Sequence, residues 1–193
     1  MSLFDEISSA ITAAMKARDK VPQREGSAMI RLQRAVFFME EEPAAGDSKP
    51  LMLNAVLSCP ILSWMSNQLL AEGVQRFFVA CDDRFAEEAR ACFPEGAEVV
   101  ISNRHSDLLA FLDTDEQVAV LPRSALPMAE AGPGFAYAAS GRELREVWQD
   151  RMTNSVTGAQ LLPGWLPVYS RAVINELEPL LRERASSGES KSI

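Results

Sequence analysis

Short apolar runs alternate with segments of helical periodicity from residue 35 onward. The runs are five or six residues long, and between them apolar residues recur every three or four positions, as on one face of a helix. The predicted strands are 35–39, 76–81, 98–102 and 117–121, and the predicted helices are 61–72, 84–92 and 107–112. Strands that alternate with helices of about ten residues imply right-handed crossovers. The pattern predicts an α/β fold, a Rossmann-like three-layer arrangement with a mostly parallel sheet.

Polar residues just before two of these helices are typical N-caps. Asp82 and Asp83 precede the second helix, and Ser106 or Asp107 is placed to cap the third. The carboxylates of Asp82 and Asp83 also suit acid–base catalysis, but capping accounts for them without any chemistry, and we prefer it. His105 adds a third residue type to Ser106 and Asp107, yet neighbours in sequence seldom form a catalytic triad.

The two ends of the chain break the alternation. Residues 1–28 form a predicted amphipathic helix and a linker, residues 29–185 form the α/β domain, and residues 186–193 are a Ser/Gly/Lys tail that we expect to be disordered. Within the domain, 141–152 and 172–184 are predicted helices, the second kinked or restarted at Pro179. Trp165 lies in a Pro- and Gly-interrupted stretch and is expected near a surface or an edge.

Composition excludes several classes of protein. The chain has 193 residues, 47% of them hydrophobic, and a formal net charge of −8, which disfavours nucleic acid and anionic membranes as partners. No apolar run is long enough to cross a membrane, and the N-terminus does not resemble a signal peptide. Cys59, Cys81 and Cys92 lack metal-binding spacing, so we expect reduced thiols, no zinc, and a cytoplasmic location.

One stretch resembles a known family. The run Ser48–Trp64, with its Lys-Pro-Leu-Met-Leu and Cys-Pro-Ile-Leu-Ser-Trp segments, is similar to sugar-phosphate nucleotidyltransferases, in particular the pyrophosphorylase domain of bifunctional N-acetylglucosamine-1-phosphate uridyltransferase. Positions 118–121 and 142–158 resemble later parts of that domain. The resemblance implies a nucleotide-diphospho-sugar transferase-type fold over roughly residues 32–163. Separately, residues 1–20 resemble the start of YqeY-like proteins, a short match that we interpret as an accessory helix.

The departures from the family fall on its chemistry. The resemblance implies a Gly-rich, Arg-containing phosphate loop, whereas this chain has Phe38-Met-Glu-Glu-Glu-Pro43, which we interpret as a solvated acidic loop. Lysines of the family correspond to Leu51 and Cys59. The Gly-Asp that holds Mg²⁺ corresponds to Arg123 and Ser124, and a guanidinium opposes a divalent cation. The sugar-binding half of the family's domain is largely missing.

The remaining candidates for contacting a nucleotide are few. They are Met39, Gly46, Lys49, Ser106 and Arg123, with no catalytic residue and no metal ligand among them. Arg123, together with Arg104, is placed to receive an anion where the strands end, but a surface salt bridge explains these arginines without a ligand, and we prefer it.

Two functions follow from these residues. The first is a degenerate nucleotidyltransferase homologue without cofactor, which binds a protein partner or a small anionic ligand and is compatible with homo-oligomerisation through the N-terminal helix. The second is an active, Mg²⁺-dependent sugar-phosphate nucleotidyltransferase that uses a rearranged loop containing Gly46 and Lys49. Binding of UTP with Mg²⁺ distinguishes the two functions.

Overall fold

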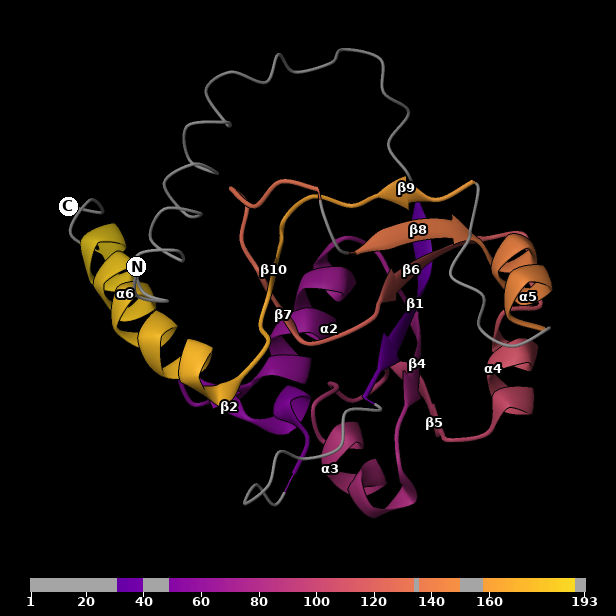
Figure 1. The fold of residues 1–193 in the computed structure, drawn as a ribbon, viewed down its shortest axis with the longest axis horizontal. Helices are drawn as coiled ribbons and strands as arrows, with labels where there is room; N and C mark the ends of the chain where they lie inside the picture. The colour runs from indigo at the N-terminus through magenta and orange to yellow at the C-terminus, as the bar shows by residue number, and fades with distance from the viewer. Residues whose placement is uncertain (1–30, 40–48, 134–135, 150–157, 190–193) are drawn as a thin grey trace, which may run out of the picture.

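A six-stranded sheet forms the centre of the computed structural model, which describes residues 31–39, 49–133, 136–149 and 158–189. The strand order is β5-β4-β1-β6-β8-β9 (Figure 1). The first four of these strands are mutually parallel, and β8 and β9 continue the sheet in antiparallel fashion. Their bounds are β1 Leu32–Phe38, β4 Arg76–Ala80, β5 Glu98–Ser102, β6 Gln117–Leu121, β8 Tyr137–Ser140 and β9 Gln160–Leu161. The predicted α/β class and mostly parallel sheet are confirmed.

Each central strand sends alternate side chains to two separate cores. On β1, Ala35 and Phe37 belong to one cluster of buried residues and Val36 to the other. The same alternation holds on β4, where Phe77 and Val79 face the first core and Phe78 faces the second. Strands buried on both faces read as continuous apolar runs, which is why these runs were visible in the sequence.

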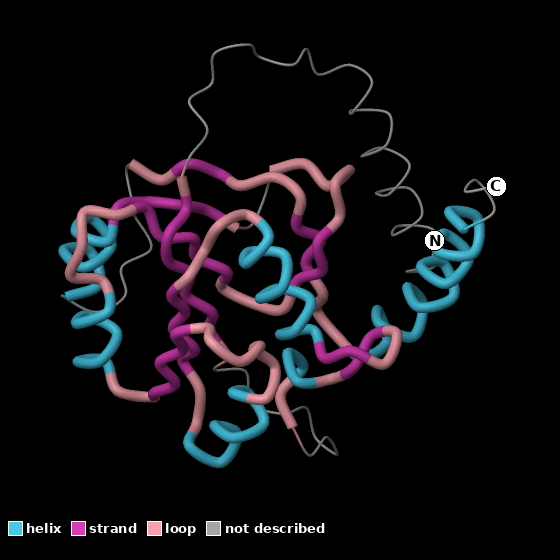
Figure 2. The backbone as a smooth tube through the Cα atoms, turned by 180° about the vertical axis from the view of Figure 1, so that it is seen from behind, coloured by secondary structure: helices cyan, strands magenta, loops and turns pink. Residues whose placement is uncertain are grey.

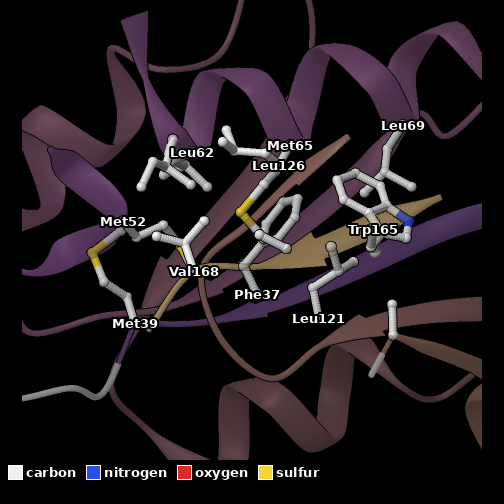
Figure 3. Packing of buried hydrophobic residues seen from close by; sticks show 14 of the residues in the cluster. Phe37, Met39, Met52, Leu62, Met65, Leu69, Leu121, Leu126, Trp165 and Val168 are labelled. Atoms are coloured by element: carbon white, nitrogen blue, oxygen red, sulfur yellow. The ribbon is translucent and has the colours of Figure 1, made fainter. Parts of the chain in front are cut away.

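Helices cover both faces of the sheet. Helix α2 (Ile61–Ala71), the 3₁₀ turn η2 (Asp83–Phe85) and α3 (Ala86–Arg90) pack on the first core, and α4 (His105–Phe111) and α5 (Gly141–Gln149) pack on the second. In Figure 3 the apolar side of α2 lies over Phe37 and Leu121 of the sheet. The predicted helix 61–72 is confirmed, and Gly73 follows it with a φ of +102°.

Three further elements contribute buried side chains to the first core. They are the two-stranded ladder of β7 (Ala125–Pro127) and β10 (Trp165–Pro167), the hairpin of β2 (Ala55–Val56) and β3 (Cys59–Pro60), and the 3₁₀ turn η1 (Leu51–Leu53). Trp165 is buried, with only 4% of its surface exposed, so the expectation of a surface position was wrong. The β7–β10 ladder accounts for this, because it turns the ring under α2 beside Leu69 (Figure 3).

The closing helix α6 (Arg171–Glu189) projects from one flank of the molecule (Figures 1 and 2). It continues as one helix through Pro179, where a kink or restart was predicted. Its Arg171 guanidinium donates to the Asn54 side chain, and its Glu178 carboxylate accepts a hydrogen bond from the Leu57 backbone N–H at 3.0 Å. These contacts tie α6 to the β2–β3 hairpin.

The predicted N-terminal helix and linker of residues 1–28 lie outside the described residues. Among the helices that are described, none has the length and apolar character needed to cross a membrane.

Candidate functional site

The carboxyl edge of the parallel strands is the natural place for a ligand in this topology. From β1 the chain moves outward to β4 and β5 and then returns to β6 on the other side of β1. The order therefore reverses between β1 and β6, and ligands of open α/β sheets bind at such a switch point. The residues that follow these strands are Met39, Cys81 to Asp83, Asn103 to Arg104, and Pro122 to Arg123.

Met39 continues β1 as a structural residue of the core. Its backbone N–H donates to the Ala80 carbonyl at 2.8 Å, and its side chain is 4% exposed. The thioether lies beside Met52 and near Val168 (Figure 3). Met39 thus forms an apolar floor beneath the edge. Gly46, the next candidate, lies outside the described residues.

Lys49 is already engaged by an acidic neighbour. Its Nζ is 2.9 Å from Glu88 Oε1 on α3, and both side chains are partly exposed. An exposed ion pair contributes little stability, but here the Glu88 carboxylate offsets the positive charge with which Lys49 would attract a phosphate.

Ser106 lies exposed in the first turn of α4, and the predicted capping there was wrong. The helix begins after Arg104, with no side-chain cap. Ser102, at the end of β5, organises this turn instead: its Oγ accepts from the Arg104 N–H at 3.0 Å and donates to Asp107 Oδ2 at 2.6 Å. Asp107 is therefore held by a serine of the strand, and this contact accounts for its position without a triad.

Arg123 lies two residues after the end of β6 and stacks on an aromatic ring. Its guanidinium carbon lies 5.4 Å from the centroid of Tyr169, whose side chain is exposed. The β7–β10 ladder places the pair, because the Val168 N–H donates to the Ser124 carbonyl at 2.9 Å. Within the described residues no carboxylate forms an ion pair with Arg123. Tyr169 was not a candidate from sequence, since nothing in the pattern links it to a residue 46 positions earlier.

Of the two aspartates after β4, Asp82 caps the backbone, as predicted, whereas Asp83 is the first residue of η2. Asp82 Oδ1 accepts from the Arg84 backbone N–H at 3.0 Å and from the Arg84 Nε at 3.3 Å. These hydrogen bonds, the backbone one first, lower the pKa of the Asp82 carboxyl. Burial, with further contributions from the charges of Asp82 and Asp83, raises the pKa of the neighbouring Cys81 thiol to about 11. A thiol held in its neutral form is a poor nucleophile.

The described residues contain no group of three or more His, Cys, Asp or Glu side chains placed to hold a metal ion. A surface hollow of about 420 Å³ lies elsewhere, at the amino ends of β4 and β5, beside Gln75, Arg76 and Glu95. The described residues of the carboxyl edge thus include an arginine–tyrosine pair after β6 and two exposed aspartates after β4.

Comparisons with known proteins give a fold-level likeness. No protein-family model matches the chain, and no curated protein sequence matches it. Among solved structures, the inositol-1-phosphate CTP transferase from T. maritima is similar, with a TM-score of 0.42 and 12% sequence identity. The match covers 51% of this chain and 46% of that chain, so this chain spans less than half of that structure. This is a weak structural similarity to a nucleotidyltransferase, and it concerns the fold alone.

Proposed function

We propose that this chain is a degenerate nucleotidyltransferase-like domain that does not carry out Mg²⁺-dependent nucleotidyl transfer and that binds a small anionic ligand at the carboxyl edge of its sheet. The observation that carries the proposal is the position of Arg123. It is the first charged side chain after β6, at the switch point, and it stacks on Tyr169 with no carboxylate partner in the described residues.

Charge is the reason why metal-assisted transfer is not expected. Mg²⁺ in phosphoryl-transfer sites is held by carboxylates and phosphate oxygens, and a guanidinium at the same point repels the ion. Asp82 and Asp83, the two exposed carboxylates that follow β4, face incoming phosphates with like charge. Two unit charges about 4 Å apart interact by roughly 1–4 kcal/mol in surface-like surroundings, which is enough to weaken triphosphate binding by about fivefold or more.

The same arrangement suits a smaller anion. An arginine presents a planar fork of donors to a phosphate or carboxylate, and stacking on a ring holds that fork in one orientation. Arg104, which follows β5, is separated from Arg123 by the width of three strand spacings, about 14 Å, and adds only long-range attraction to an anion bound at Arg123. Lys49 is paired with Glu88 and contributes less. The ligand class is therefore a small mono- or dianion rather than a nucleoside triphosphate.

Pyrophosphate release by the purified chain tests the loss of transfer. We expect no turnover of UTP or CTP with a sugar phosphate and Mg²⁺, and no calorimetric binding of either nucleotide with Mg²⁺. Turnover that disappears in Lys49→Ala would instead establish the active enzyme with a rearranged loop.

Titration with inorganic phosphate tests the anion site. We expect NMR shifts confined to the backbone amides near Arg123 and Tyr169, lost in Arg123→Gln. Arg142→Gln is the matched control, because Arg142 is an exposed arginine on α5 whose guanidinium pairs with Asp115 at 3.0 Å. Phosphate-induced shifts that are equal in both variants would refute the site while leaving the absence of transfer standing.

A further inference from the structure

Strand β5 leaves one edge of the central sheet open within the described residues. It pairs with β4 through an unbroken parallel register from Glu98 to Ser102, and no described strand lies on its other side (Figure 1). Val99 and Ile101 pack toward the first core, but Val100 points to the opposite face and is 44% exposed. The edge carries no proline and no bulge, which are common means of preventing strand pairing.

The hydrogen bonds of β5 show which backbone groups remain available. The Cys81 N–H donates to the Ser102 carbonyl at 3.2 Å, so the backbone groups of Ser102 face β4. Because backbone direction alternates along a strand, those of Val100 also face β4, whereas the N–H and C=O groups of Val99 and Ile101 face outward. These outward groups form the template for another strand.

A second copy of β5 matches this template in antiparallel orientation. With Val100 on a two-fold axis, Val99 lies opposite Ile101 of the other copy, and such a pair of outward-facing residues exchanges two hydrogen bonds. Val100 then meets Val100 at a position without hydrogen bonds, where side chains approach most closely. The exposed apolar side chain of the edge is therefore covered by its own counterpart.

Charge favours the same orientation. Glu95 precedes the amino end of β5 and Arg104 follows its carboxyl end, whereas Glu98 is already paired with Arg76 of β4, whose Nε lies 2.9 Å from Glu98 Oε2. Antiparallel pairing brings the acidic end of one copy beside the basic end of the other, whereas parallel pairing would bring like charges together. Complementarity of the strand to itself identifies the occupant as a second copy of this chain.

We propose that two copies of this chain associate through antiparallel pairing of β5 about a two-fold axis at Val100, joining their sheets into one. Because a single five-residue strand buries much less than the roughly 1,000 Å² of a stable interface, the dimer is weak, with a dissociation constant of about micromolar or above. This proposal is independent of the anion site.

Sedimentation of the full chain over a range of concentrations tests the association. We expect a monomer–dimer equilibrium whose dissociation constant rises about tenfold or more in Val100→Lys, because two lysines then face each other across the axis. Leu161→Lys is the matched control: Leu161 is 58% exposed on β9 at the opposite end of the sheet, and its replacement leaves the equilibrium unchanged. A chain that stays monomeric at all concentrations would overturn the proposal. A dimer that persists in Val100→Lys but dissociates when Phe4 and Ile7 of the predicted N-terminal helix are made polar would also overturn the proposal.

Oxidative cross-linking tests the register. We expect Val100→Cys to form a disulfide-linked dimer, because its position faces itself at a site without hydrogen bonds. Val99→Cys faces Ile101 and stays uncross-linked, and the unmodified chain measures any background from Cys59, which is half-buried. Cross-linking of Val99→Cys in place of Val100→Cys would refute this pairing.

Discussion

A nearly buried arginine links strand β1 to the end of helix α4 and to the residue before β6, and its replacement tests the packing there. Arg34 lies on β1 with 13% of its side chain exposed. Its Nε is 2.8 Å from Glu116 Oε2, its Nη1 donates to the Phe111 carbonyl at 2.6 Å, and its guanidinium lies 5.3 Å from the Phe111 ring centroid. The perturbation is Arg34→Met, which keeps the length of the side chain and removes its donors.

The loss of stability in Arg34→Met comes from the groups that lose their hydrogen-bond or ion-pair partner. The Phe111 carbonyl at the end of α4 loses its donor, which costs about 1–3 kcal/mol for a buried acceptor. The ion pair contributes less, about 0.5–1 kcal/mol, because 37% of the Glu116 side chain is exposed. We therefore expect Arg34→Met to lower the free energy of unfolding by about 2–4 kcal/mol, and Glu116→Gln by at most about 1 kcal/mol.

Urea unfolding followed by circular dichroism measures these values, and a double-mutant cycle of Arg34→Met with Glu116→Gln isolates the pair. The coupling energy should be about 0.5–1 kcal/mol, so most of the cost belongs to the carbonyl and not to the glutamate. Arg142→Met is the control, since its ion pair with Asp115 is exposed on both sides. A loss in Arg34→Met no greater than that in Arg142→Met would refute the reasoning.

Further expectations concern strain, thiols and acid. Ser58 has a φ of 65° in the β2–β3 hairpin, so Ser58→Gly should raise the free energy of unfolding by up to about 1 kcal/mol in urea melts. At about pH 8 a thiol reagent should label Cys59 first, while Cys81 and Cys92, whose thiol pKa values burial raises, react only on unfolding, as mass spectrometry would record. The lowered pKa of Asp82 means that its stabilisation is present above the ordinary value of 3.8 and is lost as pH falls through the native value, so the stability gap between the protein and Asp82→Asn should close in acid. Equal gaps at neutral and acid pH would contradict this.

The parallel strands were predictable because many residues encode them together. Strands 98–102 and 117–121 were predicted at the bounds that the structure gives for β5 and β6. A slip of one residue would turn every side chain of a strand toward the wrong core, so periodicity defines such elements strongly. Capping of η2 by Asp82 was predictable for a related reason, since its hydrogen bond to the Arg84 N–H spans only two residues.

Elements held by distant partners were not predictable. The strands β8 and β9 are short, and they exist through pairing outside their own segments, β8 with β6 and β9 with β8. The β2–β3 hairpin turns through Leu57 and Ser58, both with positive φ, where turn chemistry favours glycine or asparagine. The carboxylate of Glu178 on α6, 121 positions later, accepts from the Leu57 N–H and supports this turn. No local pattern carries that information.

The charged residues of the carboxyl edge were not predictable from periodicity either. A periodic pattern survives the change of one member, but a ligand site depends on single side chains, and each occurs only once. Arg123 after β6 alters no apolar position of the sheet, since β6 ends at Leu121 and keeps both faces buried. The fold can therefore persist when a side chain at the carboxyl edge is replaced by one of opposite charge. Buried positions such as Leu53, Val56 and Leu62 determine the architecture, whereas function depends on the edge residues, which have to be tested one by one.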